Sequence, residues 1–257
     1  MAAAARALVL VEREDYWARI TINRPRMRNA ADIATWQSIG DEVAQLAQDP
    51  DLRVLFVTGA GDRAFLAGAD LNEFPRILQS RESIQGYITA VSRACDQLEA
   101  LDIPVIAEIN GAAIGGGLEL ACACDYRIAV EGAKFGIPSA EVGLGLAYAD
   151  VARLVALAGT ARARELLIFG RSYDAAEALA AGLVNEVVPR KRLFARSKEL
   201  AVSIAAKAPL SIRSAKKVLL SVVHARAADR AEAIESILAA WDSDEMRQRI
   251  DQRLKRR

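Results

Sequence analysis

The sequence predicts an α/β fold with largely buried strands, followed by a helical C-terminal region. Two observations support this prediction. Short apolar runs rich in strand-forming residues alternate with longer segments whose apolar residues recur at helical spacing. From Lys191 onward nearly every segment has a helical pattern. A chain of 257 residues with a hydrophobic fraction of 53% is also long enough and apolar enough to bury a sizeable core.

The strand candidates are short apolar runs that end at turn-forming residues. Most of their positions are apolar, which is typical of strands covered on both faces in a parallel sheet. A late run, Leu183–Val188, is also expected to form a strand. The earlier runs are Val9–Glu12, Trp17–Ile22, Val54–Thr58, Val105–Ile109 and Tyr126–Val130.

Helices are expected between and after these strands. Ala31–Gln48 carries apolar residues at helical spacing and ends at Asp49-Pro50, and a second long helix is expected over Glu82–Leu101. Leu118–Cys124 also has a helical pattern. Near the C-terminus, Pro209 separates two expected helices.

A soft boundary near Arg190 divides the chain into a mixed core, residues 1–190, and a helical region, residues 191–257.

Composition excludes several classes of function. The 34 Lys and Arg residues nearly balance the 33 Asp and Glu residues, so no overall charge attracts nucleic acid or an acidic membrane. A single histidine, His224, excludes a multi-histidine zinc site, and no metal is expected.

No apolar run approaches the roughly 20 residues that span a bilayer. Cys95, Cys122 and Cys124 lack the pattern of a disulfide framework, and a cytoplasmic location is expected.

The most informative segment is a glycine-rich turn after a buried strand. Gly115-Gly116-Gly117 separates that strand from the expected helix, and Glu119 lies in the first helical turn. Glycines let a ligand approach the backbone, and the free N–H groups at a helix start can hold a developing oxyanion. On spacing alone, Glu119 is equally well explained as a surface acid favoured by the helix dipole.

A second glycine-containing segment is Ala64–Leu71, which includes Ala67-Gly68-Ala69-Asp70. Together with the Gly-Gly-Gly-x-Glu turn, it resembles the enoyl-CoA hydratase/isomerase (crotonase) superfamily. Further similarities to that family follow in the family's order along the chain. They are Asn23-Arg24-Pro25, Asn29-Ala30, Cys124–Ala129, Phe135–Pro138 and Gly182–Asn185.

The resemblance implies a spiral of ββα units with a helical C-terminal region that serves oligomerisation or covers the site. It further implies self-association as a homotrimer or a dimer of trimers, an acyl-CoA thioester substrate, and a place in fatty acid metabolism. Coenzyme A would be part of the substrate, with no separate cofactor. The backbone N–H groups of Ala69 and Gly116 would form the oxyanion hole. The residues expected to contact substrate or CoA are Ala67, Gly68, Ala69, Asp70, Leu71, Gly115 and Gly116.

Hydratases of the family use two glutamates. One matches Glu119, which would act as general base toward water, and the other would stand where this chain has Ser139. Ser139 cannot replace a carboxylic acid as a proton donor near neutral pH. Glu141 and Tyr148 are possible substitutes, although Tyr148 is better explained as a packed aromatic residue.

The leading hypothesis is therefore an enoyl-CoA hydratase that adds water to trans-2-enoyl-CoA thioesters. Because Ser139 replaces the second acid, another acyl-CoA reaction stays open: decarboxylation, isomerisation or thioester hydrolysis. A third hypothesis is a non-catalytic acyl-CoA-binding protein. The retained Glu119 argues against it, since binding alone needs no carboxylate at the position of the water.

Overall fold

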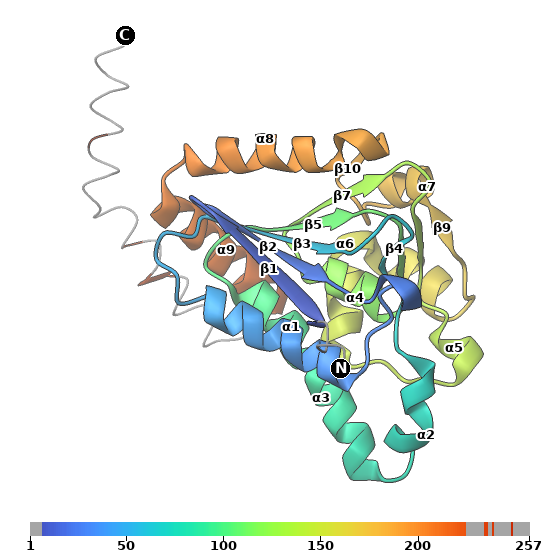
Figure 1. Ribbon diagram of the computed structural model, residues 1–257. Helices are drawn as coiled ribbons and strands as arrows, with labels where there is room; N and C mark the ends of the chain where they lie inside the picture. The colour runs from blue at the N-terminus through green and yellow to red at the C-terminus, as the bar shows by residue number, and fades with distance from the viewer. Residues whose placement is uncertain (1–6, 225–233, 236–237, 239–247, 249–257) are drawn as a thin grey trace, which may run out of the picture.

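The computed structural model describes residues 7–224 together with residues 234, 235, 238 and 248. Two sheets, one of six strands and one of four, form its framework (Figure 1). The larger sheet is parallel except for the antiparallel pair β1–β2 at one edge. In spatial order it contains β1 (Val9–Glu14), β2 (Trp17–Ile22), β3 (Val54–Gly59), β5 (Val105–Ile109), β7 (Tyr126–Val130) and β10 (Glu186–Val188).

The smaller sheet consists of strands of two or three residues. Three of them follow directly on strands of the larger sheet: β4 follows β3, β6 follows β5, and β8 follows β7. Because β3, β5 and β7 are parallel neighbours, and so are β4, β6 and β8, the chain winds through successive stacked ββα turns. This confirms the expected spiral. The bounds are β4 (Ala64–Leu66), β6 (Ala112–Ile114), β8 (Lys134–Gly136) and β9 (Tyr173–Asp174).

Helices cover the larger sheet on both sides. α8 packs against β3, β5 and β7 on one face, whereas α1 and α3 pack against each other below the other face (Figure 1). Short 3-10 turns lie at Pro25–Met27, Leu71–Glu73 and Arg190–Arg192. The α-helices are α1 (Ile33–Leu46), α2 (Phe74–Ile77), α3 (Arg81–Ala100), α4 (Gly116–Cys122), α5 (Ser139–Val142), α6 (Tyr148–Leu167), α7 (Ala175–Ala180), α8 (Leu193–Ala205) and α9 (Pro209–His224).

Most of the long elements agree with the sequence prediction, but the late strand is shorter than expected. Only Glu186–Val188 pairs with β7. The N–H groups of Leu183 and Val184 instead donate to the carbonyl of Ala178. These two apolar residues therefore close the C-terminal end of α7, where a glycine with φ of 77° reverses the chain.

The C-terminal region is helical as far as the structure describes it continuously. α8 lies directly on the larger sheet, and Lys216 of α9 donates to the carbonyl of Ile103 and to the carboxylate of Asp125. Asp125 also accepts the N–H of Val105 at the start of β5. The expected helix beyond residue 224 lies outside the described residues, apart from residues 234, 235, 238 and 248.

Within the described part of the chain, no helix combines the length and the apolar character needed to cross a membrane.

A buried ion pair stabilises the larger sheet. Arg19 of β2 donates from two nitrogens to the two carboxylate oxygens of Glu108 on β5, at 2.8 and 3.1 Å, and Glu108 is fully buried. Removing one partner of such a pair leaves an uncompensated buried charge. The contribution of this pair to stability can be compared with that of a more exposed ion pair, which Arg13 of β1 forms with Asp49.

We expect Arg19→Met to lower the free energy of unfolding by about 3–5 kcal/mol, because the buried Glu108 loses its cationic partner Arg19 while the aliphatic volume is kept. Urea denaturation followed by circular dichroism measures the change. Arg13→Met is the matched control: it removes the more exposed Arg13–Asp49 pair, and about 0–1 kcal/mol is expected. Equal losses in the two variants would contradict the assignment.

Candidate functional site

A cavity of about 620 Å³ lies beside the glycine-rich turn. Its wall combines the loop 67–71, side chains of α2 and α3, the start of α4, and the chain from Ile137 to Asp150. The lining is mainly apolar, which is the usual character of a small-molecule site with a few convergent polar groups. The polar side chains in the lining are Trp36, Tyr87, Glu119, Ser139 and Asp150.

The glycine-rich turn leaves one backbone donor free. Gly115 has φ of 53° and donates its N–H to Gly136, while its carbonyl accepts from Leu118 and Glu119. The N–H of Gly116, the first residue of α4, donates to no other group among the described residues. A Cβ at Gly116 would lie 2.8 Å from the Trp36 ring, so glycine is required there.

The loop 67–71 supplies the second free donor. Ala31 donates to the carbonyl of Gly68 and accepts from the N–H of Asp70, which forms a bridge of parallel-sheet type around Ala69. In the described part of the chain, the N–H of Ala69 itself has no acceptor. Gly115 lies so close to this loop that its Cβ would stand 3.7 Å from the Cα of Gly68. Both unpaired amides therefore belong to residues that line one cavity.

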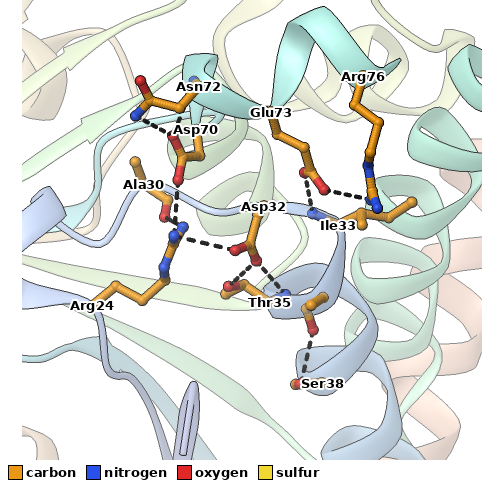
Figure 2. A network of polar contacts seen from close by, with 11 residues as sticks. Arg24, Ala30, Asp32, Ile33, Thr35, Ser38, Asp70, Asn72, Glu73 and Arg76 are labelled. Atoms are coloured by element: carbon orange, nitrogen blue, oxygen red, sulfur yellow. Dashed lines mark hydrogen bonds and ion pairs between the residues drawn. The ribbon is translucent and has the colours of Figure 1, made fainter. Parts of the chain in front are cut away.

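A polar network fixes this loop to the start of α1 (Figure 2). Arg24 donates to the carboxylate of Asp70 at 2.8 Å, forms an ion pair with Asp32 at 3.1 Å, and also donates to the carbonyl of Ala30. Burial opposes ionisation of Asp70, but the hydrogen bonds from Arg24 and Asn72 outweigh it, so the pKa of Asp70 lies below its ordinary value. Asp70 thus acts as a fixed anion that holds the loop, and it does not line the cavity.

A further contact restrains the loop from its other end. Glu73 accepts the N–H of Ile33 at 2.8 Å and pairs with Arg76 (Figure 2). Asp32 caps the same helix by accepting the N–H of Thr35. The start of α1 and the segment 70–73 are therefore tied together by side chains from both sides.

Glu119 lies in α4, one turn beyond the free N–H of Gly116, and only 6% of its surface is exposed. Burial raises the pKa of its carboxyl group to about 8; the nearby charge of Asp150 adds to the rise, and Arg153 opposes it. A strongly raised pKa in a cavity is typical of catalytic carboxyl groups. The surface-acid explanation of Glu119 does not fit this burial.

Asp150 is a cavity residue that the sequence reasoning did not single out. It lies in the first turn of α6, is 4% exposed, and accepts a hydrogen bond of 3.0 Å from Arg153. Burial raises the pKa of Asp150, while Arg153 counteracts the rise. The sequence does show that Asp150 is an acidic residue three positions before an arginine, Arg153.

Two aromatic residues of the cavity were also missed. Burial raises the pKa of Tyr87 of α3 to about 12, and the interaction of its hydroxyl group with Trp36 of α1 opposes the rise. Both look like ordinary apolar positions of amphipathic helices in the sequence. Their place beside the glycine-rich turn follows from the packing of α1 against α3.

The remaining candidates divide between the cavity and the surface. Ser139 lines the cavity at the start of α5. Glu141 is exposed. Its Oε1 lies 3.3 Å from the position that a Cβ on Gly170 would occupy. Tyr148 is 90% exposed, so it is not the packed aromatic residue expected. Neither Glu141 nor Tyr148 lines the cavity.

The residues that were expected to contact substrate lie close together. Ala67, Gly68, Ala69, Leu71, Gly115 and Gly116 all line the cavity, and Asp70 supports them from behind. Among the described residues, no group of three or more His, Cys, Asp or Glu side chains is arranged to hold a metal ion. The three cysteines are buried and unpaired.

Comparison with known proteins identifies the family of this chain. Residues 12–250 match the sequence profile of the enoyl-CoA hydratase/isomerase family. The chain is 36% identical over 215 residues to the short-chain-enoyl-CoA hydratase of Clostridium acetobutylicum, covering 82% of this chain and 80% of the relative. It is 39% identical over 210 residues to the crotonyl-CoA hydratase of Syntrophomonas wolfei, covering 81% and 79%.

Solved structures are similar over nearly the whole chain. The crystal structure of an enoyl-CoA hydratase/carnithine racemase from Magnetospirillum magneticum has a TM-score of 0.89 and 32% identity, covering 98% of this chain and 94% of the other. The profile match, the identities and the shared fold lead to one conclusion. The chain belongs to the enoyl-CoA hydratase/isomerase (crotonase) family.

Proposed function

We propose that this protein is an enoyl-CoA hydratase, which adds water across the C2=C3 bond of trans-2-enoyl-CoA thioesters. The observation that carries the proposal is one cavity that unites two unpaired backbone amides, of Ala69 and Gly116, with the buried carboxyl group of Glu119. The hydratase names of the curated relatives support the same activity.

The two amides account for stabilisation of the developing charge. When water attacks C3, the electron pair of the double bond moves toward the thioester oxygen and gives an enolate. N–H groups of Ala69 and Gly116 that donate to this oxygen stabilise the enolate, and loss of one such donor typically costs about 3 kcal/mol. The network around Asp70 keeps the first donor in place before substrate arrives.

Glu119 is the proposed general base. Its ionised carboxylate accepts a proton from the attacking water while oxygen bonds to C3. The loop 67–71 is proposed to contact the CoA part, and the apolar wall from α2 and α3 is suited to an acyl chain. Addition of water involves no net oxidation or reduction, so we propose no cofactor beyond the coenzyme A of the substrate.

Self-association as a trimer or a dimer of trimers is part of this proposal. Large apolar side chains stand exposed on several elements, among them Phe169 at 78% and Ile168 at 66%, and contact with another subunit would cover such residues. The buried, unpaired cysteines favour a reducing compartment, so we propose a cytoplasmic location and a role in fatty acid metabolism.

A second candidate function rests on Ser139. It lines the cavity where hydratases of the family place their second acid, so another enolate reaction of an acyl-CoA, such as decarboxylation, isomerisation or thioester hydrolysis, is the alternative. A purely acyl-CoA-binding role is disfavoured by the buried Glu119, because burying a carboxyl group without a use in the site is costly.

We expect Glu119→Gln to lower kcat for hydration of crotonyl-CoA and of a longer trans-2-enoyl-CoA by about 100-fold or more, because the general base is lost. Loss of the conjugated-thioester ultraviolet absorbance measures turnover, and calorimetry measures retained acyl-CoA binding. Glu141→Gln is the matched control, since Glu141 is exposed and does not line the cavity. Unchanged turnover in Glu119→Gln would remove this residue from the mechanism.

We also expect kcat/KM for hydration to rise with pH through a pKa of about 8. The sign follows from the base role: the pKa of Glu119 is raised, so the carboxylate that accepts the proton is scarce below this pH and dominant above it. Stopped-flow rates between about pH 6 and 9 measure the profile. A rate that falls over the same range would indicate that the protonated form of Glu119 acts.

A further inference from the structure

Asp150 and Glu119 are two buried carboxyl groups in one cavity. They come from different helices, α6 and α4, which pack against each other. Both line the cavity, with exposed fractions of 4% and 6%. The family resemblance accounts for Glu119 but assigns no role to an acidic residue at position 150.

Arg153 holds Asp150 by one oxygen. Its Nη1 donates to Oδ1 of Asp150 at 3.0 Å, and its Nη2 donates to Asp96 and Glu99 of α3. The described residues provide no hydrogen-bond donor for Oδ2, the other oxygen of Asp150. A carboxyl group anchored at one oxygen and free at the other is fixed in place and still able to exchange a proton.

The local charge balance favours one retained proton. Four carboxyl groups, Asp96, Glu99, Asp150 and Glu119, gather around the single guanidinium of Arg153. Asp96 has 57% of its side chain exposed, whereas Glu119 and Asp150 are buried. The other titratable groups that α3 brings to this region, Tyr87 and Cys95, carry no positive charge and have raised pKa values. Two ionised carboxylates in the cavity are therefore disfavoured, and the pair titrates as a unit.

The proposed reaction needs a second acid that Ser139 cannot provide. While the base takes a proton from water, C2 of the enolate must receive one, and a hydroxyl group is too weak an acid to supply it near neutral pH. Glu141 and Tyr148 do not line the cavity. Asp150 is the remaining carboxyl group in the lining besides Glu119.

We propose that Asp150 is the second catalytic carboxyl group of this enzyme and that it shares one proton with Glu119; this inference rests on the proposed hydratase function. Ionised Glu119 accepts a proton from water as oxygen bonds to C3, and the electron pair of the double bond moves to the thioester oxygen. Protonated Asp150 gives its proton to C2 as the enolate returns to a thioester. The proton on Glu119 then passes to Asp150, which restores the starting state with one water consumed.

The test uses Asp150→Asn, which keeps the shape of the side chain and an oxygen to accept from Arg153. We expect kcat for crotonyl-CoA hydration to fall about 100-fold or more. Exchange of the C2 protons of butyryl-CoA with deuterated water, followed by NMR, should fall in parallel. In wild type the rate should fall again at pH values above the inflection assigned to Glu119, where the pair loses its retained proton, and Asp150→Asn should lack this second inflection.

Asp96→Asn is the matched control, because it removes a carboxylate from the same arginine at a side chain outside the cavity lining. It should retain near wild-type kcat, C2 exchange and pH profile. Equal effects of Asp96→Asn and Asp150→Asn, or an unchanged second inflection in Asp150→Asn, would overturn the inference and leave Asp150 as a support for Arg153.

A second variant distinguishes loss of acid catalysis from misfolding of Asp150→Asn. Ser139→Glu in the Asp150→Asn background places a carboxyl group at the family's usual position, and recovery of at least about tenfold in kcat is expected if the missing function is acid catalysis. No recovery, in a variant that binds butyryl-CoA normally, would count against the inference. Failure of the proposed hydratase function can be distinguished from failure of this inference. If the proposed function is wrong, the wild-type protein itself does not hydrate crotonyl-CoA.

Discussion

The close approach of the glycine-rich turn to the end of β4 and to the loop 67–71 is the constraint on which the site depends. A Cβ at Gly117 would lie 2.0 Å from the carbonyl oxygen of Leu66, and one at Gly116 would overlap the Trp36 ring. Only residues without a side chain let α4 begin at this distance from β4. This packing places the amides of Gly116 and Ala69 at one cavity.

Burial, which the same packing produces, also sets the chemistry of the carboxyl groups. Glu119 sits between α3, α6 and the short strands, where little water stabilises its charge, and its pKa rises accordingly. Arg153 limits the cost of placing several acids together by pairing with Asp96, Glu99 and Asp150. Acid–base function and structural stabilisation are thus carried by one connected cluster.

The larger sheet could be predicted because its strands and helices are long enough to show their periods. Trp17–Ile22, Val105–Ile109 and Tyr126–Val130 form strands over the expected residues. The smaller sheet could not be predicted, since strands such as Ala64–Leu66 have too few residues to show an alternation. Their pairing depends on the stacking of successive turns of the spiral, which local sequence does not record.

The sequence by itself determined the family, the glycine-rich turns and the choice of Glu119 as the candidate general base. Each of these depends on residues that are adjacent in the chain. Tertiary structure decided which groups surround Glu119. Asp150 and Arg153 belong to α6, whereas Asp96 belongs to α3 and lies 57 residues before Arg153 in the chain. Their proximity arises from packing of α3, α4 and α6, and proton affinity depends on distances and burial in three dimensions.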